Sequence, residues 1–312
     1  MNTSSEIILV NGVEANSVSV LDRGLHYGDG LFETIACRGG RARFLSYHLE
    51  RLIGGCERLR IRFDALAQLT DEIERLAGQS DLSLIKVIVT RGVATARGYS
   101  PTGNETATRV VLRYSWPKED STAWRDGVAV RLAEQRLGEN PALAGLKTLN
   151  RLEQVLARSE WDDPRIAEAL MLSSSGLLVS GTMSNVFLVE EGKLRTPRIE
   201  RCGVAGIMRR VVLQEASRAG IAREECDLNA DDLQRADEIF LTNARIGIWP
   251  VRALDSRVLA PGPTTKQIQE WLGPLLVDSP DEPAAQGSKN SESDAASPTS
   301  AHTSDPKERG RA

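Results

Sequence analysis

Apolar runs alternate with glycine-rich and polar segments along most of this chain, and their spacing predicts short strands and amphipathic helices. In the first part of the chain we expect β structure in five segments: 7–10, 18–21, 32–35, 82–90 and 109–114. Asn11-Gly12 predicts a tight hairpin turn after the first of them. A helix is expected to follow Ser46 as its N-cap, with one apolar face formed by Leu49, Leu52, Ile53, Cys56 and Leu59.

The pattern resumes after a polar stretch at 118–125, which we interpret as a linker. The linker predicts two domains, over residues 1–120 and 121–277. Beyond it we expect strands at 127–137 and 238–243, and a β meander of three strands at 167–172, 177–179 and 185–189. Two further helices are expected, one opening at 203–209 and one over 265–276.

A strong amphipathic helix is also predicted directly after Lys147, with a buried stripe formed by Leu149, Leu152, Val155, Leu156 and Ser159. Lys147 lies at the junction of loop and helix, between Leu146 and Leu149. Apolar surroundings disfavour the charged form of an amine and lower its pKa. A neutral amine can attack a carbonyl and form a Schiff base. The alternative is an ordinary surface lysine near the start of a helix.

Composition indicates a soluble globular protein, with 41% hydrophobic and 26% charged residues. The net charge of −4 gives no indication of nucleic-acid or anionic-membrane binding. No secretory signal or membrane-spanning run is evident, so we expect a cytoplasmic protein. The four scattered cysteines are expected to behave as small buried hydrophobic residues in a reducing compartment. Residues 278–312 contain none of Val, Ile, Leu, Met, Phe, Tyr or Trp, so we expect a disordered tail.

Three features are candidates for binding anions. Arg51 lies off the apolar stripe of its helix, either as a solvated side chain or as a bidentate clamp for a phosphate. The loop that carries Arg97 and Tyr99 can bind a carboxylate or can simply be a hairpin tip. The glycines at 203–206 precede a helix, whose free N–H groups suit an anion.

Several motifs together resemble the fold-type IV pyridoxal-phosphate enzymes, the branched-chain-aminotransferase-like family, and within it the aminodeoxychorismate lyases. The most specific is segment 143–154, with the sequence Leu-Ala-Gly-Leu-Lys-Thr-Leu-Asn-Arg-Leu-Glu-Gln. The others follow in family order, in segments 22–23, 27–34, 48–52, 90–92, 97–100, 184–187, 203–207 and 241–243. The resemblance implies an α/β (α+β) fold with a small N-terminal α/β domain and a larger β-rich C-terminal domain. It also implies a homodimer.

Position by position, the resemblance implies a site for pyridoxal 5'-phosphate. Lys147 would hold the cofactor as a Schiff base, and Arg51 would clamp its phosphate. Four further residues would bind the same phosphate, the first two through their backbone N–H groups: Ile207, Met208, Thr242 and Asn243. Relatives often have threonine at the position of Met208, so one side-chain contact would be missing here.

Other positions correspond to residues that act on the substrate. Thr34 matches a threonine that binds substrate or relays a proton. Arg97 and Tyr99 are the candidates for holding a substrate carboxylate. Asn150 or Arg151 falls where relatives place a group near the phenolic oxygen of the cofactor.

One position departs from the family pattern. Relatives have a glutamate that pairs with the protonated pyridine nitrogen, and this chain has Ser180 there. A carboxylate keeps the ring a strong electron sink, whereas a serine hydroxyl forms only an ordinary hydrogen bond. An aminotransferase should suffer more from this change than a lyase whose product becomes aromatic. Alternatively, a one-residue gap lets another acid take the place of the glutamate.

The implied activity is the conversion of 4-amino-4-deoxychorismate to 4-aminobenzoate and pyruvate, a step of folate biosynthesis. Lys147 would be the general base, and Lys147 with Thr34 the general acid. A D-amino-acid or branched-chain aminotransferase of the same fold is the alternative enzyme. A cofactor-binding dimer without catalysis is the alternative from another class. No metal, nucleic-acid or membrane partner is expected.

Overall fold

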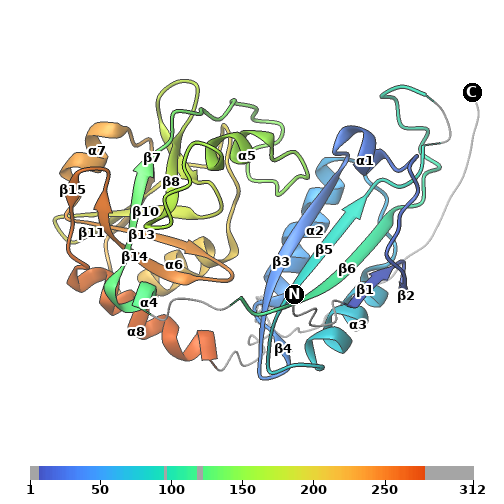
Figure 1. Ribbon diagram of the computed structural model, residues 1–312, viewed down its shortest axis with the longest axis horizontal. Helices are drawn as coiled ribbons and strands as arrows, with labels where there is room; N and C mark the ends of the chain where they lie inside the picture. The colour runs from blue at the N-terminus through green and yellow to red at the C-terminus, as the bar shows by residue number, and fades with distance from the viewer. Residues whose placement is uncertain (1–6, 95–96, 118–121, 278–312) are drawn as a thin grey trace, which may run out of the picture. The chain divides into compact units, whose positions relative to one another are not determined.

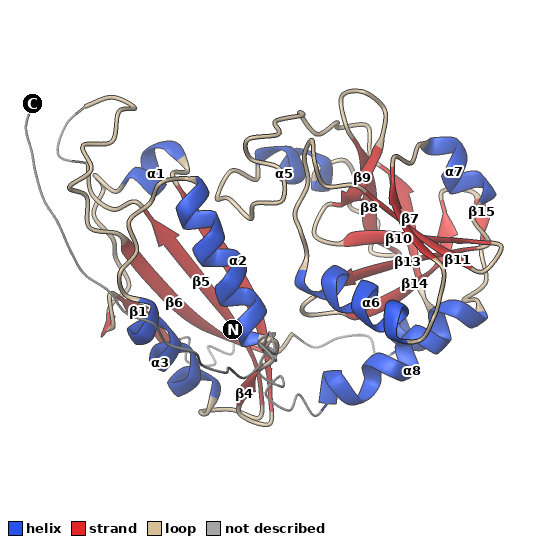
Figure 2. Ribbon diagram, turned by 180° about the vertical axis from the view of Figure 1, so that it is seen from behind, coloured by secondary structure: helices blue, strands red, loops and turns tan. Residues whose placement is uncertain are grey.

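Two β-sheets, each with its own apolar core, organise the described residues of the computed structural model, which are 7–94, 97–117 and 122–277 (Figures 1 and 2). The predicted tail at 278–312 and the first half of the predicted linker lie outside these residues. The domain limits at 120 and 277 therefore remain predictions. None of the helices in the described part is both long and apolar enough to cross a bilayer.

The N-terminal sheet is antiparallel and has the strand order β2-β1-β6-β5-β3-β4. Its strands are β1 (Ile7–Val10), β2 (Val13–Glu14), β3 (Gly30–Arg38), β4 (Arg41–Ala42), β5 (Leu82–Thr90) and β6 (Thr108–Ser115). Its helices are α1 (Arg23–Tyr27), α2 (Leu45–Arg58) and α3 (Leu66–Ala77). The predicted hairpin at Asn11-Gly12 is confirmed, and both residues have positive φ, of 51° and 88°.

Side chains alternate along β3 between the two faces of this sheet. Leu31, Ile35 and Cys37 pack into the core beneath α2 and α3, which cover one face of the sheet (Figure 2). Phe32 and Thr34 therefore belong to the opposite face. Glu33 falls on the helix-covered face, which places a carboxylate within an apolar layer.

The second sheet is mixed and has the order β12-β11-β10-β13-β14-β7-β8-β9, with β15 paired to β14. Its strands are β7 (Val128–Leu132), β8 (Ile166–Leu172), β9 (Leu178–Gly181), β10 (Asn185–Glu190), β11 (Lys193–Pro197), β12 (Arg223–Cys226), β13 (Glu238–Asn243), β14 (Gly247–Leu254) and β15 (Arg257–Val258). Its helices are α4 (Thr122–Asp126), α5 (Leu152–Arg158), α6 (Ile207–Arg218), α7 (Ala230–Arg235) and α8 (Pro263–Val277). Helices α6 and α8 share a core with β10 and β13.

The prediction of β structure at 18–21 is wrong, because these residues form no strand and three of their apolar side chains are exposed. The predicted N-cap Ser46 is also wrong. Helix α2 begins at Leu45, after Phe44 in the left-handed conformation, and no side chain caps it. The apolar face of this helix is confirmed, with Leu52 and Cys56 buried.

Three further expectations need correction in the second sheet. The strand expected at 127–137 stops at Leu132, where the chain leaves the ladder. The meander is wrong at its second step, because β10 pairs with β11 and β13 rather than with β9. The described end of the expected linker is helical, in α4.

The buried stripe predicted after Lys147 is wrong as well. Helix α5 begins only at Leu152, and Leu152, Val155 and Leu156 are 77%, 56% and 57% exposed. Ala157 is the buried residue of this helix, packed with Trp161. The periodicity correctly indicates an apolar face, but it does not say that anything in the same chain covers that face.

All four cysteines are free thiols. Cys37, Cys56 and Cys226 are buried, as expected, whereas Cys202 is partly exposed. Burial raises the pKa of Cys37 to about 11 and that of Cys56 to about 12, so both thiols stay protonated at neutral pH.

Candidate active site

The backbone of Lys147 joins the two sheets at one point. Its carbonyl accepts a hydrogen bond of 2.9 Å from the N–H of Phe32 on β3. Two residues later, the N–H of Leu149 donates to the carbonyl of Gly30 at 3.0 Å. Lys147 is therefore held beside β3 by ladder-like bonds, although it lies in a loop.

The other side of the same loop is bound to the segment before α6. Gly145, with φ 82°, donates to the carbonyl of Gly203 at 3.0 Å and accepts from the N–H of Ala205 at 3.1 Å. Arg58, from the end of α2, adds a clamp by donating to the carbonyls of Pro141, Ala142 and Ala144. Lys147 is thus positioned by three elements that are distant in the sequence.

The amine of Lys147 is poised to lose its proton near neutral pH. Its Nζ lies 4.2 Å from the centre of the Phe32 ring. Burial lowers the pKa of Lys147, and the positive charge of Arg51 lowers it further, to about 7. Glu33 opposes this shift without cancelling it. About half of the amine is then neutral at pH 7, and the expected lowering of the pKa of Lys147 is confirmed.

This shift predicts the pH dependence of Lys147 reactivity in the ligand-free protein. Because the neutral amine is the nucleophile, labelling by a small acylating reagent should rise with pH and reach its half-maximal rate near pH 7. An ordinary lysine, with a pKa of about 10.4, reaches it more than three pH units higher. Peptide mass spectrometry after short pulses from pH 5 to pH 10 measures both classes of lysine in one sample. Parallel profiles for Lys147 and exposed Lys266 would contradict the prediction.

A buried carboxylate, Glu33, lies between a guanidinium and an imidazole. Arg51 donates to it through Nε at 2.8 Å and through a second nitrogen at 2.5 Å. Nδ1 of His48 lies 2.7 Å from the same carboxylate. The Arg51 pair is bidentate, which is the strong geometry for a guanidinium and a carboxylate.

The charges in this cluster follow from the same contacts. Burial by itself raises the pKa of Glu33, but Arg51 and His48 outweigh it and lower that pKa to about 2. Burial lowers the pKa of His48, although Glu33 opposes the shift. His48 is therefore neutral at pH 7 and donates from Nδ1 to Glu33. Its Nε2 is a buried acceptor without a partner among the described residues.

Arg51 also reaches the start of α6, where its third nitrogen donates to the carbonyl of Ala205 at 2.6 Å. Gly206 is the N-cap of α6, and no side chain caps the helix there. A Cβ at Gly206 would lie 1.9 Å from Oδ1 of Asn185, so only glycine fits. The first N–H groups of the helix, including those of Ile207 and Met208, have no acceptor within the helix. Together with Arg51, this helix end has the chemistry of an anion site.

Thr242 and Asn243 lie at the end of β13, where their side chains stabilise the turn to β14. The hydroxyl of Thr242 donates to the carbonyl of Gly247 at 2.6 Å. Oδ1 of Asn243 accepts from two backbone N–H groups of the turn, and its amide donates to the carbonyl of Met183 at 3.1 Å. These contacts engage both side chains, and a role in binding phosphate remains a prediction.

Thr34 lies on the face of β3 that also carries Phe32, away from the helices. Arg151 approaches the same ring, with its guanidinium carbon 6.0 Å from the ring centre, and donates to the carbonyls of Thr148 and Leu146. Asn150 points elsewhere and donates to the carbonyl of Gly28. Asn150 and Arg151 were the two candidates for a group near the phenolic oxygen of the cofactor. Of these two, Arg151 is the one that approaches the Phe32 ring.

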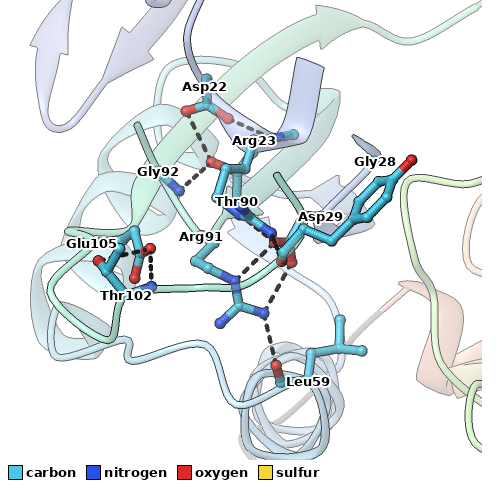
Figure 3. Close-up of polar contacts among 12 residues, drawn as sticks. Asp22, Arg23, Gly28, Asp29, Leu59, Thr90, Arg91, Gly92, Thr102 and Glu105 are labelled. Carbon is cyan, nitrogen blue, oxygen red and sulfur yellow. Dashed lines mark hydrogen bonds and ion pairs between the residues drawn. The ribbon is translucent and has the colours of Figure 1, made fainter. Parts of the chain in front are cut away.

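The loop with Arg97 and Tyr99 is anchored rather than brought to Lys147. Asp29 binds two guanidinium groups, those of Arg23 and Arg91, each at 2.8 Å (Figure 3). Arg23 also donates to the carbonyl of Tyr99 at 2.8 Å. The Tyr99 side chain is 83% exposed, and Arg97 is exposed. This chain alone therefore does not place either residue in contact with Lys147.

Burial by itself raises the pKa of Asp29, but Arg91 and Arg23 outweigh it and lower that pKa below its usual value. Asp29 is therefore ionised at neutral pH and holds both guanidinium groups. The cluster fixes the backbone of the loop, and the Tyr99 ring lies 5.2 Å from the Tyr27 ring, centre to centre.

Ser180 lies on β9, where its hydroxyl donates to the carbonyl of Gly181 at 2.8 Å. Glu168, on the neighbouring strand β8, is an acid that could be considered as a replacement for the missing carboxylate. It is already fully engaged, because it accepts bonds from Thr182, Met183 and Ser184. The expectation that another acid substitutes for the glutamate therefore gains no support from Glu168.

Sequence reasoning missed Glu33, the Asp29 cluster and Lys86, a lysine of β5 beside the Phe32 ring. One signal was available for Glu33. It stands between Leu31 and Ile35 at the spacing of a buried strand face, where an acid requires a partner. For Lys86 and for the pairing of Asp29 with Arg91, the partners are too distant in the sequence to be paired by spacing.

Comparison with known proteins identifies the family of this chain. The family model of amino-transferase class IV matches residues 30–254. The aminodeoxychorismate lyase of Vibrio harveyi is 35% identical over 248 residues, which cover 79% of this chain and 91% of that protein. A D-alanine aminotransferase of Bacillus licheniformis is 28% identical over 263 residues, which cover 82% and 90%. The crystal structure of 4-amino-4-deoxychorismate lyase from Pseudomonas aeruginosa superposes with a TM-score of 0.82 at 45% identity, covering 85% of this chain and 98% of that one.

The chain therefore belongs to the amino-transferase class IV family. The expected two-domain, fold-type IV architecture is confirmed. The predicted resemblance to aminodeoxychorismate lyases is confirmed as well, by similarity in both sequence and structure.

Proposed function

We propose that this protein is a pyridoxal-phosphate-dependent lyase that converts 4-amino-4-deoxychorismate to 4-aminobenzoate and pyruvate. The observation that carries the proposal is the amine of Lys147, with a pKa of about 7, held beside Arg51 and the uncapped start of α6. Relatives that carry the lyase name cover most of this chain. The reaction is a step of folate biosynthesis.

The residues present fit pyridoxal 5'-phosphate. Lys147 would hold it covalently, and Arg51 with the N–H groups of Ile207 and Met208 would bind its phosphate. Gly206 leaves no room for a side chain beside Asn185, and no side chain caps the helix there, so the first N–H groups of α6 would be open to such an anion. Thr242 and Asn243 would shape the adjoining turn, and Ser180 would face the ring nitrogen. When bound, the cofactor supplies an aldehyde that captures amines and a ring that accepts electrons.

Lys147 and Thr34 move the protons in this proposal. The neutral Lys147 amine removes the proton from the substrate carbon that bears the amino nitrogen. The bond from the neighbouring carbon to the enolpyruvyl oxygen then breaks, and the ring becomes aromatic. The methylene carbon of the leaving group takes up a proton from Lys147 or from Thr34, which gives pyruvate. The number of protons is unchanged over the whole reaction.

Ser180 supports a lyase over an aminotransferase. A neutral hydroxyl stabilises a protonated ring nitrogen less than a carboxylate does, which weakens the ring as an electron sink. Aromatisation of the product drives the lyase reaction forward, whereas amino transfer has no such drive. A pH-independent absorbance of the protonated ring in the holoenzyme would contradict this interpretation of Ser180.

The decisive experiment compares two reactions of the same preparation. The purified holoenzyme is incubated with 4-amino-4-deoxychorismate, and pyruvate and 4-aminobenzoate are measured. A parallel sample receives D-alanine or a branched-chain amino acid with a 2-oxo acid. We expect equimolar products in the first sample and negligible amino transfer in the second. The reverse result indicates an aminotransferase, and no turnover in either sample indicates a binding protein without catalysis.

We also propose that the protein is a homodimer, which the exposed apolar face of α5 supports. Leu152, Val155 and Leu156 on this helix and Tyr99 on the anchored loop are all more than half exposed. Apolar side chains gathered on one helix face are more typical of a subunit interface than of a free surface. A second copy of the chain over this face would also bring the active site of one subunit within reach of Arg97 and Tyr99 of the other. The cytoplasmic location remains a prediction from the sequence.

Charge on this face should dissociate the dimer. The double substitution Leu152→Glu and Leu156→Glu buries two unpaired carboxylates in the interface, which disfavours association by several kcal/mol. Light scattering after size exclusion at micromolar concentration should give the monomer mass for this variant and the dimer mass for the native protein. Val258→Glu, on β15 and 84% exposed, is the matched control and should stay dimeric. A monomeric native protein would refute the proposal.

A further inference from the structure

A second lysine approaches the Phe32 ring and has no role in the chemistry described so far. Nζ of Lys86 lies 5.4 Å from the centre of this ring, and Nζ of Lys147 lies 4.2 Å from the same centre. Lys86 is paired with Thr34 across the ladder of β5 and β3. The two lysines and the threonine are therefore grouped around one aromatic side chain.

The strand around Lys86 makes this charge unusual. Strand β5 lies between β6 and β3, and its other eight residues are apolar or hydroxyl-bearing. Its other ladder partner is Leu112 on β6. A lysine in the middle of a central strand loses part of the hydration of its ammonium group. This loss costs free energy unless an anion lies close enough to balance the charge.

No side chain of the described residues supplies that anion. Lys86 forms no ion pair with any described carboxylate and instead lies against the Phe32 ring. The acid of the neighbouring strand, Glu33, belongs to the opposite face and is engaged by Arg51 and His48. Lys86 and Arg151 both lower the pKa of Lys147, so their positive charges act at the same site.

The other cations near the ring have partners or would bind the cofactor. Arg151 donates to backbone carbonyls and is held in place by them. Lys147 would be occupied by its bond to the cofactor. Arg51 is paired with Glu33 and faces the start of α6. Lys86 is left as the cation available to a substrate.

We propose that Lys86 binds a carboxylate of the substrate and thereby selects a dianionic substrate. The proposal rests on the lyase function proposed above. The amino group of 4-amino-4-deoxychorismate would meet Lys147, and its two carboxylates, one on the ring and one on the enolpyruvyl group, extend away from that amine. Alanine and the branched-chain amino acids each carry only one carboxylate, next to the amino group. Lys86 therefore distinguishes the two substrate classes by charge and by reach.

The test replaces the ammonium while keeping the length of the stem, in Lys86→Met. Losing a charge-assisted hydrogen bond should raise KM for 4-amino-4-deoxychorismate about 10- to 100-fold. The kcat should change much less, because the interaction is made in both the ground state and the transition state. Lys86→Arg keeps the charge and should recover most of the affinity. Lys266→Met, an exposed lysine of α8, is the matched control and should behave as the native protein.

Product binding identifies the carboxylate. Dissociation constants of 4-aminobenzoate and of pyruvate are measured by calorimetry on the native and Lys86→Met holoenzymes. Weaker binding of 4-aminobenzoate assigns the ring carboxylate to Lys86, and weaker binding of pyruvate assigns the enolpyruvyl carboxylate. Unchanged KM and unchanged binding of both products would overturn the proposal, as would a loss confined to kcat.

A measurement without turnover checks the proximity of the two amines. Lys86 lowers the pKa of Lys147, so Lys86→Met should move the half-maximal pH of Lys147 labelling upward in the ligand-free protein, and Lys86→Arg should not. Should Lys86→Met fail to fold, Lys86→Gln takes its place in both measurements. A native protein that releases no pyruvate refutes the proposed function itself, whereas normal pyruvate release with an unchanged variant refutes only the role of Lys86.

Discussion

Replacement of Lys147 by alanine should abolish both the covalent retention of pyridoxal 5'-phosphate and the release of pyruvate. The side chain supplies the amine that would hold the cofactor and the base that moves the substrate proton, and no described residue duplicates both roles. Loss of a positioned base alone costs about 10²- to 10⁴-fold in rate, and loss of the covalent anchor adds to it. We expect turnover at or below the detection limit of a coupled pyruvate assay.

The same variant is examined for cofactor attachment independently of turnover. Borohydride reduction of the native holoenzyme, followed by peptide mass spectrometry, should give an adduct at residue 147 and none in Lys147→Ala. Lys193→Ala removes a surface lysine that pairs with Glu224 and should leave both readouts unchanged. Residual turnover in Lys147→Ala, or an adduct at another lysine in the native protein, would refute the assigned chemistry.

Neutralisation of Glu33 should cause the largest loss of stability. Glu33→Gln keeps the shape of the side chain but removes the buried charge that pairs with Arg51 and His48. Removing one partner of a buried pair leaves the other charge without compensation, which typically costs about 3–5 kcal/mol. The free energy of unfolding of the cofactor-free protein, measured with urea at pH 7, should fall by this amount.

The pH dependence of this loss has a definite sign. The folded pKa of Glu33, about 2, lies below the ordinary value of 4.5. The ionised carboxylate therefore contributes its full stability above about pH 4.5, and the contribution is lost as the pH falls toward 2. The difference between the native protein and Glu33→Gln should shrink over this range. Glu57→Gln, at an exposed position of the same helix as Arg51, should change stability by less than about 0.5 kcal/mol at every pH.

Local patterns predicted most of the elements in this fold. The apolar runs at 7–10, 82–90 and 238–243 correspond to β1, β5 and β13, because a buried strand needs a continuous or alternating apolar sequence. The prediction at 18–21 was wrong because an apolar sequence is not sufficient to form a strand. Four residues with strand-like composition form no ladder unless a neighbouring strand presents free backbone groups to them.

The residues of the candidate site likewise fall into two groups, those that the sequence identified and those that it did not. Lys147, Arg51 and the glycines before α6 were identified from short motifs, because each lies in a contiguous stretch that resembles the family pattern. Glu33 and Lys86 were not identified. Their roles depend on partners that the ladder between β3 and β5 and the helix over it bring close.

The amino-acid order alone indicated the family, the candidate reactive lysine and the glycine-led helix start, since each is written in a contiguous stretch. Folding in three dimensions decided the rest. It lowered the pKa of that lysine, paired Glu33 with Arg51, aligned Lys86 with Thr34 and left the apolar face of α5 uncovered. Burial and charge depend on the residues that surround a group, and where these come from separate segments of the chain they are brought together only by folding.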